Sequence, residues 1–151
     1  MLHLSHKMQL LSLRISQIIP DWNKRALDLS DFYALCERLS VTVIETPLAS
    51  SGFYFRVKGR DVIAVDSRMT GLKKLAVLFH ELGHFLLHDP GARVSVSFNR
   101  LARRDRNERE ADLFALCAIM PQPLLRDLSD PLSLPTDLWH KRLSIYDLYK
   151  L

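Results

Sequence analysis

The residues His80-Glu81-Leu82-Gly83-His84 lie inside a longer stretch, residues 70–88, whose apolar side chains recur at the spacing i, i+3, i+4 and i+7. This spacing predicts an amphipathic helix. Residues four apart on a helix lie one turn apart and about 40° from overlap, so the rings of His80 and His84 share one face. Two imidazoles on one face can bind a single metal ion, and Glu81 points to one side of the pair. The motif is therefore typical of a metal-dependent hydrolase.

Glu81 is badly placed to bind an ion held by the two histidines, but its carboxylate can reach a water molecule on that ion. A Zn²⁺ ion with an open position lowers the pKa of its water from about 15.7 to about 7. We therefore expect Glu81 to be the catalytic base, which takes the proton of the water and passes it to the leaving amine. Two histidines and a glutamate on a core-facing helix would be costly to bury without such a function. The sequence predicts a zinc-dependent metalloendopeptidase, with Mn²⁺ or Fe²⁺ as alternative ions.

A third ligand is expected from a second helix, which the pattern predicts from Asn107 to about Ile119. Glu108 and Asp112 share a face of this helix, so Glu108 can complete a site of two histidines and one glutamate. Asp112 can then accept a hydrogen bond from the outer N–H of a ligand histidine. Glu110 points roughly 200° away from Glu108, so both cannot be ligands. We expect Glu110 to be solvated and paired with nearby arginines, although the sequence leaves the choice between the two glutamates open.

His88 follows His84 by four residues, but it lies two turns, about 12 Å, from His80 along a straight helix. One ion cannot comfortably bind all three. We expect His88 to support a ligand histidine from outside, to face the substrate, or to stabilise the C-terminal end of the helix. A hydrogen-bond donor for the transition state is also expected, and Tyr54, His88 and Tyr146 are candidates by residue type. For Tyr54, packing against the helix is the more common role.

The rest of the chain alternates between helical and strand-like patterns. Ser30 is the expected N-cap of the helix at 30–39, and Thr136 or Ser133 is that of the last helix. Lys58-Gly59 predicts a turn between two strands and hence a hairpin. Residues 91–106 are expected to form a polar connection with at most a short strand at 93–98. The expected elements are helices at about 4–19 and 30–39, strands at 41–45, 53–57 and 61–65, and helices at 70–88, 107–119 and 136–149.

The composition is that of an ordinary globular protein: 151 residues, of which 48% are hydrophobic and 25% charged. This size predicts one domain over residues 1–151, with a catalytic core at about 30–127. The longest apolar run, Leu113–Met120, is too short to span a bilayer, and two basic residues interrupt the apolar N-terminal segment. Cys36 and Cys117 lie in apolar helical patterns and are expected to be buried free thiols. We therefore expect a cytoplasmic protein with no membrane contact.

The net charge of +4 and a pI near 9.3 make the chain mildly basic. Between Asp89 and Arg106 there are five arginines and two aspartates. We expect a solvated basic loop there, and the alternative is a docking surface for an acidic or nucleic-acid-bearing partner. No regular interleaving of aromatic residues supports base stacking, so direct nucleic-acid binding is not expected.

Three segments, taken in this order, resemble the ImmA/IrrE family of metallopeptidases over roughly residues 30–127. The segments are His-Glu-Leu-Gly-His-Phe-Leu-Leu-His at 80–88, Glu-Arg-Glu-Ala-Asp-Leu-Phe-Ala at 108–115 and Ile-Met-Pro at 119–121. The two predicted strands in Gly52–Asp66 also look like that family. The resemblance implies an α+β fold, a small zincin-like domain with a short antiparallel sheet packed on the HExxH helix. It also implies that His80, His84 and Glu108 bind the metal and that Glu81 is the catalytic base.

The described members of this family cleave helix-turn-helix transcriptional repressors and so switch on stress-response or mobile-element genes. The resemblance therefore implies a protein substrate, a DNA-binding repressor in which this chain hydrolyses a peptide bond. The alternative is a non-catalytic regulatory binding module on the same fold, an anti-repressor or toxin-like partner. The intact Glu81 favours the enzyme, because a pure binder needs no base. A purely structural metal site would usually be rich in cysteine, a pattern that Cys36 and Cys117 do not show.

Overall fold

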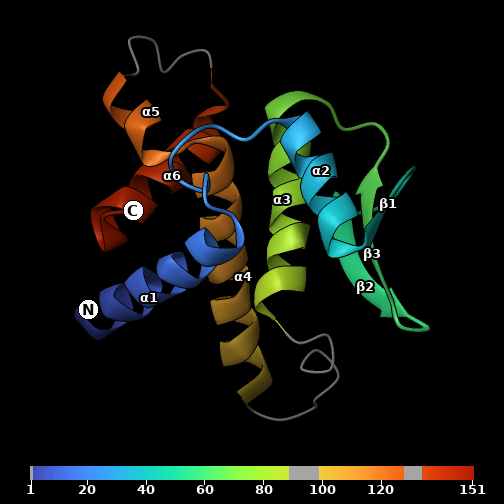
Figure 1. Cartoon of the computed structure of the whole chain (residues 1–151), viewed down its shortest axis with the longest axis horizontal. Coiled ribbons are helices and arrows are strands. Elements are labelled where there is room, and N and C mark those ends of the chain that lie inside the picture. The colour runs from blue at the N-terminus through green and yellow to red at the C-terminus, as the bar shows by residue number, and fades with distance from the viewer. Residues whose placement is uncertain (1, 89–98, 128–133) are drawn as a thin grey trace. The chain divides into compact units, whose positions relative to one another are not determined.

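The computed structural model describes residues 2–88, 99–127 and 134–151 and has an α+β fold (Figure 1). The chain divides into two compact units, one formed by Asp28–Ala115 and the other by Met1–Leu27 with Leu116–Leu151. Among the described residues, no helix combines the length and the apolar character that crossing a bilayer requires. The elements are α1 (Leu2–Ile18), α2 (Leu29–Leu39), β1 (Val41–Thr46), β2 (Gly52–Val57), β3 (Arg60–Asp66), α3 (Gly71–Leu87), α4 (Asn99–Ile119), α5 (Gln122–Asp127) and α6 (Thr136–Tyr149).

Two helices begin with caps that differ from the predicted ones. The N-cap of α2 is Asp28 and not Ser30. Asp28 Oδ1 accepts from the amide of Asp31 at 2.8 Å, and Asp31 Oδ2 accepts from the amide of Asp28 at 2.9 Å. This reciprocal capping box satisfies two amides that the helix leaves without partners, which a serine at position 30 would not do. The N-cap position of α6 is Pro135, with no side-chain cap, and Ser133 lies outside the described residues.

The sheet has the strand order β1-β3-β2, and it is mixed. Strands β2 and β3 form the predicted antiparallel hairpin, whose turn residues Lys58 and Gly59 both have positive φ, as a type I′ turn requires. Strand β1 pairs in parallel with β3, so the expectation of a purely antiparallel sheet is wrong. The chain leaves β1, forms β2 at the far edge and returns between the two. The four consecutive buried residues Val62–Val65 show that β3 is covered on both faces.

The core of the unit Asp28–Ala115 is centred on α3. Leu78, Phe79 and Leu82 are fully buried. The ring of Phe79 meets Phe32 of α2 edge-on at 5.3 Å between centroids and Phe114 of α4 at 6.2 Å. These apolar contacts hold the helix that carries the HExxH motif from both sides. The predicted helix at 70–88 is confirmed to within one residue at each end.

Helix α4 begins at Asn99, eight residues before the predicted start. The segment Asn99–Arg106 was expected to be a charged loop, but arginine, leucine and alanine are strong helix formers, and charge by itself does not break a helix. Glu108 therefore lies in the middle of α4, where the dipole of the helix N-terminus has faded. Helix α5 was also not expected, and its Pro123 lies in the first turn, where proline is tolerated. The possible strand at 93–98 lies outside the described residues.

The other unit is built around Trp22 and Arg142, which are 1% and 0% exposed. The Arg142 guanidinium donates to the carbonyl of Met120, just beyond the C-terminal end of α4, and to Asn23 Oδ1 at 3.2 Å. A cation is favourable at that end of a helix. Burial lowers the pKa of Arg142.

Both cysteines are buried free thiols, as predicted. Burial raises the pKa of Cys36 to about 12, and that of Cys117 to about 12. Both thiols therefore stay protonated at neutral pH, and a protonated thiol is a poor nucleophile.

Candidate metal centre

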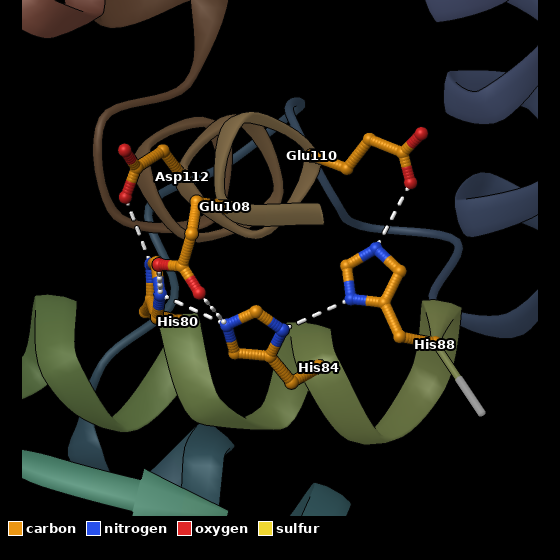
Figure 2. A network of polar contacts seen from close by, with 6 residues as sticks. All are labelled: His80, His84, His88, Glu108, Glu110 and Asp112. Atoms are coloured by element: carbon orange, nitrogen blue, oxygen red, sulfur yellow. Dashed lines mark hydrogen bonds and ion pairs between the residues drawn. The ribbon is translucent and has the colours of Figure 1, made fainter. Parts of the chain in front are cut away.

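The site is formed where α4 crosses the face of α3 that carries the histidines, and Gly83 allows this close approach. A Cβ atom at Gly83 would lie 3.0 Å from Cδ1 of Phe114 and 3.3 Å from Cα of Ala111. A larger residue would push the two helices apart. The glycine therefore brings the carboxylates of α4 over the imidazole rings of α3 (Figure 2).

Three side chains converge at the centre of this crossing. The Nε2 atoms of His80 and His84 lie 3.1 Å apart. Oε2 of Glu108 is 3.0 Å from His80 Nε2, and Oε1 is 3.0 Å from His84 Nε2. In a tetrahedral site with ligand distances of about 2.0–2.1 Å, neighbouring ligand atoms are about 3.3 Å apart. The three groups are thus spaced as ligands of one ion are.

The donor set also fits a metal. Two imidazole nitrogens and one carboxylate are one of the ligand sets of catalytic zinc sites, which keep a fourth position open. The His84 side chain is 4% exposed, whereas the Glu108 side chain is 49% exposed. The cluster is therefore closed on the side of α3 and open to solvent beside Glu108.

Glu81 lies beside this triangle and is buried, with 8% of its surface exposed. One of its carboxylate oxygens and one ring nitrogen each of His80 and His84 lie within 4.8 Å of one another. Glu108, by contrast, contacts the Nε2 atoms of both histidines. This difference agrees with Glu108 as a ligand and with Glu81 as a group that reaches a water molecule next to the ion.

Asp112 contacts the outer nitrogen of His80, with 2.8 Å between Oδ1 and Nδ1. Burial acts to lower the pKa of His80, but the hydrogen bond and the charge of Asp112, with the charges of Glu81 and Glu108, raise it above its usual value overall. An Nδ1–H held by Asp112 leaves the Nε2 lone pair of His80 directed toward Glu108 and His84. The structure thus brings Asp112 to the position that the i, i+4 spacing predicts.

The expectation that Glu110 faces solvent is wrong, because its carboxylate contacts His88. Its Oε2 atom lies 2.9 Å from Nε2 of His88, and its side chain is 20% exposed. Nδ1 of His88 in turn lies 2.9 Å from Nδ1 of His84. The helical offset of Glu110 from Glu108 holds, and Figure 2 shows the two on opposite sides of α4. The prediction assumed that this side of α4 faces solvent. It failed because His88, at the C-cap of α3, contacts that side.

The two tyrosines suggested as transition-state donors have other contacts. The Tyr54 hydroxyl donates to Oδ1 of Asp61 at 2.6 Å, and its ring packs edge-on against Phe85, with centroids 5.9 Å apart. This is the packing role expected for Tyr54. Tyr146 lies on α6 in the other unit, where the Lys150 ammonium sits over its ring.

The sequence was also compared with known proteins. The family model Peptidase_M78, described as the IrrE N-terminal-like domain, matches residues 36–141. The matched region contains all seven polar residues of the cluster, namely His80, Glu81, His84, His88, Glu108, Glu110 and Asp112. No curated protein and no solved structure matches the chain.

Proposed function

Since the chain belongs to the IrrE N-terminal-like domain family of peptidases, we propose that it is a zinc-dependent metalloendopeptidase. The observation that carries this proposal is the triangle formed by His80 Nε2, His84 Nε2 and the Glu108 carboxylate, with separations of 3.0–3.1 Å. A buried glutamate, Glu81, lies beside it. A cluster of this composition combines a metal-binding set with a base.

In the proposed mechanism, His80, His84 and Glu108 would hold the ion. When bound, Zn²⁺ would supply a water molecule of lowered pKa and polarisation of the scissile carbonyl. Glu81 takes the proton of the attacking water as the new C–O bond forms, and it gives that proton to the amine as the C–N bond breaks. Asp112 holds the His80 ring in the tautomer whose Nε2 is free to bind. Mn²⁺ and Fe²⁺ are the alternative ions, because this ligand set accepts several divalent metals.

We further propose that the fold is zincin-like and that residues 1–151 act as one metallopeptidase domain. Packing of the HExxH helix against a small sheet supports the first point: Gly52 of β2 is so close to α3 that a Cβ atom there would lie 2.8 Å from Val77 Cγ1. The family match supports the second, because it extends over parts of both compact units.

The proposed substrate is a helix-turn-helix transcriptional repressor, a suggestion that rests on the resemblance of the paired motifs to ImmA/IrrE metallopeptidases. A DNA-binding substrate would place the reaction in the cytoplasm. The open side of the cluster at Glu108 suits a protein chain, since an extended segment needs access from solvent.

The decisive experiment incubates the zinc-loaded protein with candidate helix-turn-helix proteins encoded nearby, with and without a chelator, and analyses the products by mass spectrometry. We expect one of them to be cut at a defined bond only when metal is present. Glu81→Gln should keep the metal and lose the cleavage, because an amide cannot take the proton. Glu37→Gln, an exposed glutamate on α2, is the matched control. Tight binding without any cleavage by the parent protein would instead identify a regulatory binding module.

A further inference from the structure

The contacts on the far side of His84 assign a role to two residues that the proposed mechanism does not use. We propose that Glu110 is a positioning residue that acts through His88 to fix the orientation and the tautomer of His84. This inference rests on the proposed metal site, since it concerns how one of its ligands is held. It is carried by a continuous row of contacts from Glu110 Oε2 to His88 and from His88 to His84 Nδ1, each 2.9 Å long.

The proton positions along this row are determined once His84 binds a metal through Nε2. A ligand nitrogen carries no proton, so a neutral His84 carries its proton on Nδ1. Nδ1 of His88 must then accept that hydrogen bond, and a neutral His88 carries its own proton on Nε2. That nitrogen faces the carboxylate of Glu110, which can only accept. Each contact thus has one donor and one acceptor. The opposite arrangement would place a lone pair of His88 against the carboxylate.

A shorter version of this arrangement holds His80. Asp112 contacts His80 Nδ1 directly at 2.8 Å. Figure 2 shows the two carboxylates on opposite sides of α4, with Asp112 next to His80 and Glu110 separated from His84 by the His88 ring. Each histidine of the triangle is therefore connected to one carboxylate of α4, and His88 spans the longer distance.

Burial favours a positioning role for His88 over contact with the substrate. The His88 side chain is only 5% exposed, and that of His84 is 4% exposed. Both ring nitrogens of His88 are also occupied by protein partners at 2.9 Å, one by His84 Nδ1 and the other by Glu110 Oε2. In a buried environment a hydrogen bond to a carboxylate is also stronger than it is in water. His88 is thus suited to transmit the orientation set by Glu110.

A set of variants tests this row through metal affinity. We expect Glu110→Ala to lower the zinc affinity about 10- to 100-fold, as is usual for a partner of a ligand histidine. His88→Ala should lower it at least as much. Because Glu110 acts only through His88, the double variant should bind zinc as well as His88→Ala does. Glu110→Gln, whose amide oxygen can still accept, should retain most of the affinity. Asp105→Ala is the matched control, since it removes an exposed carboxylate from the same helix.

Affinity is measured by competition with a chromophoric chelator, and the His84 tautomer by ¹⁵N NMR of the zinc-loaded protein. We expect the protonated Nδ1 of His84 to lose its hydrogen-bonded shift in His88→Ala and in Glu110→Ala, which a purely structural role would not cause. The proposed positioning role is disproved if the losses of zinc affinity in the two single variants multiply in the double variant. It is also disproved if the ¹⁵N signals of His84 do not change. Neither result depends on proteolysis. A failure here is therefore distinct from failure of the proposed function, which would appear as absent cleavage by a zinc-loaded parent protein.

Discussion

The two helices that form the cluster differ in how firmly they hold their polar side chains. On α3, His84 and Glu81 are buried, and the helix is fixed by fully buried apolar residues on both sides. On α4, the Glu108 and Asp112 side chains are 49% and 40% exposed. Buried groups with fixed orientations are costly to rearrange, whereas exposed carboxylates adjust easily. Helix α3 thus provides the rigid part of the site and α4 the adaptable part.

The largest expected effect comes from breaking the rigid part. His84→Ala should abolish zinc binding in the micromolar range, because it removes one of the two imidazole ligands from the buried side of the site. Glu108→Ala should weaken binding strongly but leave some of it, since water can reach the exposed position and substitute. Isothermal titration with zinc measures both, with His140→Ala, an exposed histidine, as the control. Equal losses in the two variants would show that the contrast in burial has no bearing on affinity.

A smaller effect is expected where α4 supports α3. Asp112→Ala should reduce zinc affinity about 10- to 100-fold, because His80 loses the partner that fixes its ring. The metal and the fold should both remain. Competition with a chelator gives the affinity, and circular dichroism checks the helices. An unchanged affinity would mean that the contact between Asp112 and His80 does not persist in solution.

The close approach of the helices can be tested independently of the metal. Gly83→Val adds three carbon atoms where even a single Cβ would meet Phe114 and the backbone of Ala111. We expect the metal-free protein to lose about 1–3 kcal/mol in the free energy of unfolding. Urea denaturation measures this, and Lys73→Val on the exposed side of α3 is the control. If both variants lose the same amount, the loss comes from valine in a helix and not from the crossing.

The smallest expected effect is a pH dependence of the metal-free protein. The pKa of His80 is raised in the folded state by Asp112, against the opposing effect of burial. A raised pKa means that protonated His80 stabilises the fold fully below its unfolded pKa of about 6.5 and that this contribution is lost as the pH rises through the folded value. The urea midpoint should therefore fall over that range, and it should fall less in Asp112→Ala. If the urea midpoint depends on pH equally in both proteins, the contact between Asp112 and His80 is not the origin of that dependence.

The parts of the site that follow from local periodicity were predictable. The pairs His80–His84 and Glu108–Asp112 are both i, i+4, and the structure brings all four together. The partner of Glu110 was not predictable, because it depends on where the end of α3 meets the far side of α4. A residue pattern within one helix contains no information about the ring that another helix presents to it. His88 offered the only signal, since a third histidine in register raises the question of its partner.

In the fold, too, local features could be predicted and contacts between distant segments could not. The hairpin follows from the turn residues Lys58-Gly59, and α3 follows from its apolar period. The parallel pairing of β1 with β3 depends on which edge of β3 is free after the hairpin forms, which is a property of the assembled sheet. The early start of α4 was missed for another reason, because a dense run of arginines was taken to indicate a loop. In both cases the residues were compatible with the observed element without specifying it.

The proposed ligands of the cluster come from two helices, and His80 and Glu108 are 28 residues apart in the sequence. A metal bound there acts as a cross-link that an unfolded chain cannot form, so its binding free energy adds to the stability of the fold. At a free zinc concentration 100 times the dissociation constant, this amounts to about 2.7 kcal/mol. The melting temperature should therefore rise with the zinc concentration and fall on adding a chelator. Through this linkage, the supply of metal would determine how much folded protein is present as well as how much of it is active.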